Sequence, residues 1–245
     1  MIMSKTYETG HAKNVANANL IISYITQLDT IYKPSNADIE LDNLQTIYTA
    51  AFADMEDINA ALPPYTLAVD DRKMVFAPVN KKLTKLHKVY RATKGVTEAQ
   101  LEDFMTISRK LRGTRKTQPA APVPPETEQT QYSVSQLSYD QRTNTFAQLI
   151  ELLQNTPNYA PNETEYQIRT LQIEREQMMR TTQQVADTYF PLNMARGKRN
   201  QTMYTGKTNL VDTFNTSKDY LYTILDTKSP EYKAIAKLKF KKLAK

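Results

Sequence analysis

A Tyr-x-Pro motif occurs twice in this chain, at Tyr32 and at Tyr159, and this repetition limits the possible folds more than any other feature. At the same offset of 127 residues, further positions match: Pro34 with Pro161, Pro64 with Pro191, Arg72 with Arg199, and Leu83 with Leu210. Prolines and arginines that match in one register indicate an internal duplication. We therefore predict two helical repeats, at residues 1–113 and 137–245.

The segment between the predicted repeats, residues 114–136, has the composition of a linker. It contains four prolines and many polar residues, with few large apolar side chains. Such a composition favours extended chain without a core of its own. We predict a Pro-rich linker there.

Each Tyr-x-Pro motif follows a helical stripe of apolar residues and precedes a second one. Residues 11–31 carry apolar side chains at helical spacing, and Pro34 disfavours helix at the residue before it. Ser35 or Asn36 can cap the next helix in the first copy, and Asn162, with Glu165 three residues later, can do so in the second. The motif is thus predicted to be a helix–helix corner, with the tyrosine packed beneath it.

A heptad-like seam of apolar residues follows the first corner, from Leu41 to Tyr90, and the second copy keeps it less cleanly. Prolines at 63, 64 and 191 remove backbone donors, so the chain either kinks and continues or reverses as a hairpin. The seam stays in phase across the break, which favours the kink. A last helix is expected in each copy, capped by Thr97 and by Ser229.

The predicted fold class is therefore all-α, as an elongated tandem duplication of a helical-bundle repeat with long proline-kinked helices. The chain has only 5 glycines among 245 residues, fewer than the many turns of a β-rich fold would need. No apolar run is long enough to span a membrane, and the first residues do not form a secretory signal. We expect a cytoplasmic protein, although this leaves leaderless export open.

The sequence offers little chemistry for catalysis. It has no cysteine and only two histidines, His11 and His87, which we expect to be solvated and on a helix surface among lysines, respectively. Acidic clusters such as Asp54, Glu56 and Asp57 are expected on helix surfaces. A phosphate loop at Gly206 is excluded because the required upstream glycine is missing. We predict no catalytic residue, no metal, no cofactor and no enzymatic activity.

Two kinds of basic residue are candidates for contacts. Arg72 and Arg199 stand at equivalent seam positions where apolar residues are expected; each either pairs with a local acid such as Asp70 or Asp71, or sets the register of a partner helix. The net charge of +6 is concentrated at the end of each repeat. The candidate basic contact patch consists of Arg109, Lys110, Arg112, Arg115, Lys116, Lys237, Lys239, Lys241, Lys242 and Lys245.

Three segments, SKTYETGHAKNVAN from Ser4, ALPPY from Ala61 and SPEYKAIAKLKF from Ser229, resemble those of a set of helical proteins from bacteria of the Bacteroidota group. The resemblance covers the whole chain, linker included. It implies a bacterial, non-secretory, duplicated helical protein. No activity is known for that set, so the resemblance assigns no site residue.

These features together predict a non-enzymatic structural or interaction protein that self-assembles through helical faces into a homo-oligomer or filament. An acidic protein is a further possible partner for the basic ends. Two alternatives remain open and are less favoured: a membrane-active, toxin-like helical component, and a nucleic-acid-associated basic helical protein.

Overall fold

The computed structural model describes residues 10–113 and 138–242, so the predicted linker at 114–136 lies outside the described residues. Within these ranges the chain is all-α and forms no strand. This confirms the predicted fold class at the level of secondary structure. The order of the main helices is α1 (His11–Leu28), α2 (Leu41–Phe76), α3 (Val79–Ala92), α4 (Glu98–Arg112), α5 (Tyr139–Gln154), α6 (Ile168–Asn200), α7 (Leu210–Ile224) and α8 (Pro230–Lys237).

The described residues form two compact units. Unit 1 contains residues 10–64 and 189–242, and unit 2 contains residues 65–113 and 138–188. Each unit therefore combines segments from both of the repeats predicted from the sequence. The long helices α2 and α6 each contribute residues to both units.

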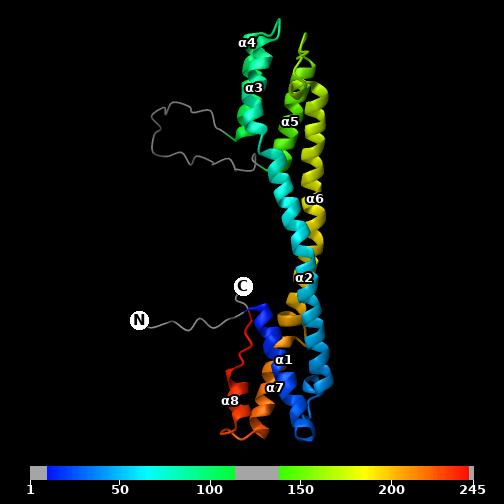
Figure 1. The fold of residues 1–245 in the computed structure, drawn as a ribbon, viewed down its shortest axis with the longest axis vertical. Helices are drawn as coiled ribbons and strands as arrows, with labels where there is room; N and C mark the ends of the chain where they lie inside the picture. Colours follow the sequence, from blue (N-terminus) through cyan, green and yellow to red (C-terminus); the bar gives the residue numbers. More distant parts are fainter. Residues whose placement is uncertain (1–9, 114–137, 243–245) are drawn as a thin grey trace, which may run out of the picture. The chain divides into compact units, whose positions relative to one another are not determined.

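In unit 1, α1 packs along α7, and α7 contacts α8 (Figure 1). The core contains apolar residues of α1, the first turns of α2, and α7, with Ile235 and Phe240 closing one side. The α1 residues in this core, which follow the predicted helical spacing, are Val15, Ala18, Ile21, Ile22 and Ile25. The helical stripe read from residues 11–31 is confirmed; its last turn is the 3-10 helix η1 (Asp29–Ile31).

In unit 2, α4 packs against both α3 and α5 (Figure 1). Tyr90, Phe104 and Phe146 are fully buried in its core, and the Tyr90 and Phe104 rings stack with centroids 5.3 Å apart. On α3 the buried residues are Val79, Leu83, Leu86 and Tyr90. These are the positions that the seam predicted, so the part of the seam on α3 is confirmed as a core-facing stripe.

The two corners have the geometry predicted from the Tyr-x-Pro motif. The Tyr32 hydroxyl donates to the Ile39 carbonyl at 2.7 Å, and the Tyr159 hydroxyl donates to the Tyr166 carbonyl at 2.8 Å. In each case the bond closes a loop over a short 3-10 helix, η2 (Ala37–Ile39) or η4 (Thr164–Tyr166). The tyrosine side chain thus stabilises the corner by this hydrogen bond.

Three of the helix caps predicted from the sequence are present in the structure, and one is not. Thr97 forms a capping box with Gln100, Ser229 accepts a hydrogen bond from the Tyr232 N–H, and the Asn36 side chain accepts one from the Asp38 N–H. The predicted cap at Asn162 is wrong, because η4 begins after Glu163 and has no side-chain cap.

The helices α2 and α6 continue through Pro63, Pro64 and Pro191, so the alternative of a hairpin at these prolines is wrong. A proline inside a helix leaves the carbonyl of the preceding turn without its donor. All three prolines are exposed, where water can hydrate these carbonyls. The seam is interrupted nearby, since Leu62 is 41% exposed while Ala68, outside the predicted seam, is buried.

Candidate interaction surfaces

Arg72 lies in an aromatic cluster of unit 2. Its guanidinium carbon is 4.0 Å from the centroid of the Tyr139 ring, and Tyr139 meets Phe76 edge to face at 4.8 Å. A cation over an aromatic ring contributes about 0.5–2 kcal/mol, depending on how far water is excluded. Asp70, one of the two predicted local partners, pairs with Lys73 at 3.0 Å. The Arg72 guanidinium thus lies over an aromatic ring, and its predicted contact with a partner helix stays a prediction.

Arg199 occupies a polar setting in unit 1. Its Nε and Nη2 atoms donate to Asn200 Oδ1 at 3.2 and 2.8 Å, and burial lowers the pKa of its guanidinium. The neighbouring His11 is half-buried, and its Nδ1 lies 2.7 Å from the Tyr204 hydroxyl. The prediction of a solvated His11 is wrong. Burial, followed by the charge of Arg199, lowers the pKa of this imidazole.

The predicted basic patch is divided between two places in the structure, and part of it lies outside the described residues. Arg109, Lys110 and Arg112 end α4 in unit 2, whereas Lys237, Lys239, Lys241 and Lys242 lie at the end of α8 and beyond it in unit 1. Arg115, Lys116 and Lys245 lie outside the described residues. In unit 1 part of the charge is neutralised, because Lys242 Nζ is 2.6 Å from Asp212 Oδ2. This contact is the main cause that lowers the pKa of Asp212.

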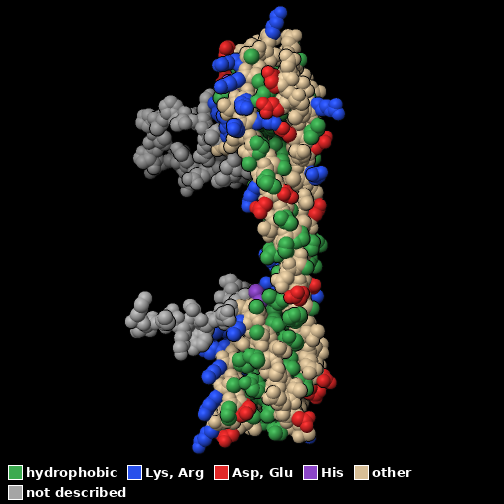
Figure 2. Space-filling view, viewed as in Figure 1, with side chains coloured by type: hydrophobic (Ala, Val, Ile, Leu, Met, Phe, Trp, Pro, Cys, Tyr) green, Lys and Arg blue, Asp and Glu red, His purple; other side chains and the backbone are tan. Residues whose placement is uncertain are grey.

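A larger cationic surface on α3 was missed by the sequence reasoning. From Lys81 to Lys94 the chain carries six positive charges and no acid, a signal that was visible in the sequence. Figure 2 shows Lys and Arg side chains gathered on unit 2 over the region of α3 and α4.

A groove of about 1160 Å³ lies in unit 1 between α2 and α6. Beside it, Asp54 is fully buried, and Lys198 Nζ lies 2.9 Å from Asp54 Oδ1 and 3.2 Å from Asp57 Oδ2. The expectation that Asp54 lies on a helix surface is wrong: the lysine supplies the counter-charge that lets the carboxylate be buried. The contact with Asp54, and then that with Asp57, raises the pKa of Lys198.

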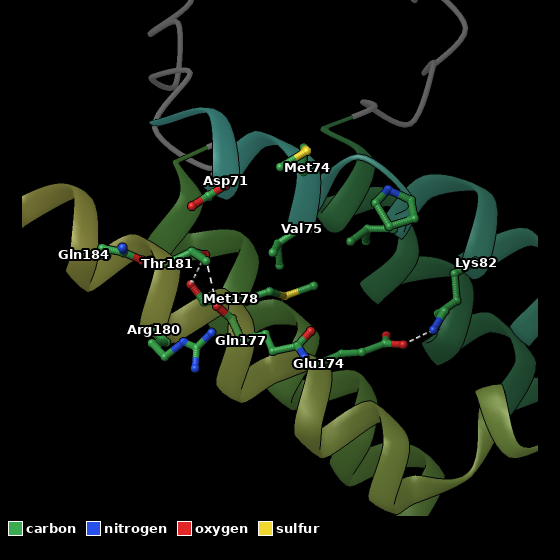
Figure 3. A pocket seen from close by; sticks show the side chains of 12 residues that line it. Asp71, Met74, Val75, Lys82, Glu174, Gln177, Met178, Arg180, Thr181 and Gln184 are labelled. Carbon is green, nitrogen blue, oxygen red and sulfur yellow. Dashed lines mark hydrogen bonds and ion pairs between the residues drawn. The ribbon is translucent and has the colours of Figure 1, made fainter. Parts of the chain in front are cut away.

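A smaller pocket of about 490 Å³ lies in unit 2 (Figure 3). Lys82 points across it to Glu174 and pairs with that carboxylate, while Met74, Val75 and Met178 supply apolar wall. The Thr181 hydroxyl donates to the Gln177 carbonyl at 2.9 Å. The lysine in this pocket is thus ion-paired and the hydroxyl is hydrogen-bonded, and neither is placed to act as a base or a nucleophile.

His87 lies beside the α3 cations and is half-buried, with its ring centroid 5.3 Å from that of Phe104. Burial, then the charges of Arg91 and Arg112, lower the pKa of its imidazole. Among the described residues, no group of three or more His, Cys, Asp or Glu side chains could hold a metal ion. Within the same ranges no helix has both the length and the apolar character needed to cross a membrane.

Comparisons with protein-family models, with curated proteins and with solved structures found no match to this chain.

Proposed function

We propose that this chain is a non-enzymatic structural protein that associates with further copies of itself through helical faces of α2 and α6. Three pairs of large apolar residues carry the proposal. They stand at equivalent positions of the two copies, 127 residues apart, and both members of each pair are exposed. The pairs are Phe52 with Met179, Leu62 with Tyr189, and Leu67 with Met194.

The proposed duplication gains support from contacts that recur at the same offset. The corner bonds of Tyr32 and Tyr159 each reach a carbonyl seven residues ahead. The tyrosine in each corner also meets a residue of the other copy: Tyr32 bonds to Ser217, and the Tyr159 ring lies 6.2 Å from that of Tyr90, the residue equivalent to Ser217. Such correspondence favours one ancestral module, a corner followed by a long proline-containing helix, present twice.

Exposure that recurs in both copies is informative because exposed apolar residues promote aggregation. Single exposed leucines or methionines are normal on any protein surface. Exposure at three matched pairs favours a surface that is used, and a chain with two similar faces can bind head to tail into rings or filaments. Figure 2 shows apolar side chains on the surface of each unit.

The exposed fractions of Leu67 and Met194, 64% and 57%, indicate how much an interface could gain there. Full burial of such a side chain contributes about 1.5–3 kcal/mol. The two side chains are already partly buried, so they would together contribute roughly 2–4 kcal/mol to one contact, on the order of a 30- to 1000-fold change in the association constant.

The test is size-exclusion chromatography with light scattering over a range of protein concentrations. We expect the wild-type mass to exceed 28.1 kDa and to rise with concentration. The double variant Leu67→Lys/Met194→Lys should approach the monomer mass, because each lysine places a charge in the proposed contact.

Gln45 and Gln172 provide a matched control, since they are equivalent, exposed and on the same two helices. Gln45→Lys/Gln172→Lys adds the same charge and should leave the mass distribution unchanged. A wild-type protein that stays at 28.1 kDa at every concentration would refute self-association, and equal effects of both double variants would refute the apolar contact.

A further inference from the structure

The face of α3 that points away from the core of unit 2 is continuously cationic. Lys81, Lys85, Lys88, Arg91 and Lys94, here called the α3 face, are all exposed. They recur at intervals of three or four residues, so those within the helix share one side of it. The opposite side, from Val79 to Tyr90, is buried in the core. The cations are thus presented by a rigid element.

The charge of the α3 face is not neutralised within the part of the chain that the structure describes. No ion pair there involves Lys81, Lys85, Lys88, Arg91 or Lys94. Lys82 differs, because it points to the pocket and pairs with Glu174. In unit 1, by contrast, Lys198 and Lys242 are both paired with aspartates.

The C-terminal turn of α4 adds to this surface. Arg112 Nη2 donates to Thr84 Oγ1 on α3 at 2.9 Å, so its guanidinium lies against the α3 face. Arg91 and Arg112 both act on His87, which places the two arginines near one imidazole. Crowding of like charges without an acid between them costs free energy unless an anion binds there.

We propose that the α3 face, with Arg112, binds the phosphate backbone of a nucleic-acid duplex without reading its sequence. From Lys81 to Arg91 the helix rises about 15 Å. Duplex DNA presents one phosphate charge for about every 1.7 Å of axis, so the four α3-face cations of that stretch, together with Arg112 beside them, can each meet a phosphate, which makes five contacts. Charge complementarity along a helix therefore selects a polyanion with closely and regularly spaced phosphates.

The neighbouring side chains favour a duplex over a lipid surface and over a single strand. Helices that bind membranes insert an apolar face, but the apolar face of α3 is buried in the core, and none of its large apolar side chains is exposed. Single-strand binding proteins stack bases on exposed aromatic rings. On α3 and α4, Tyr90 and Phe104 are fully buried and unable to stack.

The experiment measures binding of the full chain to two fluorescent 24-base-pair DNA duplexes of unrelated sequence, by anisotropy, at 50–200 mM NaCl. Five phosphate contacts predict a slope of log K against log salt of about −4.5, so affinity should fall roughly 500-fold over this range. Both duplexes should bind equally. The variant Lys85→Glu/Lys88→Glu/Arg91→Glu should reduce the slope to about −2.

The matched control is Lys233→Glu/Lys237→Glu/Lys241→Glu, which changes three exposed lysines of unit 1 and gives the same change in net charge. It should retain the wild-type slope, since it leaves the α3 face intact. Circular dichroism checks the fold of both triple variants. If the glutamate variant of α3 is not helical, Lys85→Gln/Lys88→Gln/Arg91→Gln takes its place.

Three outcomes would overturn the proposal. The first is no binding to either duplex at 50 mM NaCl, and the second is an equal loss in the two triple variants. The third is binding to vesicles with 30% phosphatidylserine, or to a polyglutamate peptide, that exceeds binding to the duplexes. That result would assign the α3 face to a membrane or to an acidic protein instead.

Discussion

The hydroxyl of Tyr32 has two hydrogen-bond partners at the first corner, and its removal gives a sharp test of the fold. It donates to the Ile39 carbonyl at 2.7 Å and lies 3.1 Å from Ser217 Oγ. Tyr32, Ile39 and Ser217 are 7%, 3% and 0% exposed, so water cannot replace the lost partner. Tyr32→Phe should therefore leave a carbonyl and a hydroxyl unsatisfied, at about 1–3 kcal/mol in total.

Tyr159→Phe is the internal comparison, because this tyrosine occupies the equivalent place in the second corner. Its hydroxyl donates to the Tyr166 carbonyl, and no second hydrogen bond of it is seen among the described residues. Loss of one hydrogen bond at a partly buried site should cost about 0.5–1.5 kcal/mol. Urea denaturation monitored by circular dichroism should give a lower free energy of unfolding for Tyr32→Phe than for Tyr159→Phe.

A double-mutant cycle identifies which atoms carry the cost. Ser217→Ala removes the second unsatisfied group, so the double variant Tyr32→Phe/Ser217→Ala should be less destabilised than the sum of the single variants. Additive effects would show that the two hydroxyls do not interact. The reasoning fails outright if Tyr32→Phe is neutral, or if Tyr159→Phe costs more than Tyr32→Phe.

Three further changes test other parts of the structure. Gly206→Ala should destabilise the protein by about 1–3 kcal/mol in urea denaturation, because the added Cβ would lie 2.8 Å from the Gln201 carbonyl oxygen; an unchanged midpoint would contradict that contact. Lys198→Met should lower the melting temperature by leaving the buried carboxylate of Asp54 unpaired, and adding Asp54→Asn should restore part of the loss; no recovery would contradict the pairing. Burial raises the pKa of Tyr159 above the ordinary value of 10, so folding favours the neutral hydroxyl. The stability that the neutral hydroxyl contributes is therefore present below pH 10 and is lost as the pH rises above that value. Melting curves from pH 8 to pH 12 should fall less steeply for Tyr159→Phe than for the wild type.

Local structure was predictable where a short segment contains its own signal. The corner at Tyr32 and the caps at Thr97 and Ser229 need only residues a few positions apart. The cap at Asn162 was mispredicted because the same signal fits two starting points, and the chain forms a short 3-10 helix before α6 begins. Propensity alone does not decide between such alternatives.

Contacts between distant segments were not predictable from spacing. Asp54 was placed on a surface because its neighbours in sequence are acidic, but its burial depends on Lys198, which lies 144 residues further along the chain. The contact of Tyr32 with Ser217 likewise spans 185 residues. A single sequence gives the stripe that a helix buries, and it does not name the helix that covers that stripe.

The two proposed interactions respond differently to ionic strength, and this difference separates them experimentally. Sodium chloride screens the α3 face, so duplex binding should weaken roughly 500-fold between 50 and 200 mM. Contacts through Leu67 and Met194 are apolar, and burial of apolar area is not weakened by screening. The light-scattering mass should therefore stay constant over the same salt range in the absence of DNA. A mass that falls to 28.1 kDa as salt rises would mean that charge holds the copies together, and the proposed apolar contact would be wrong.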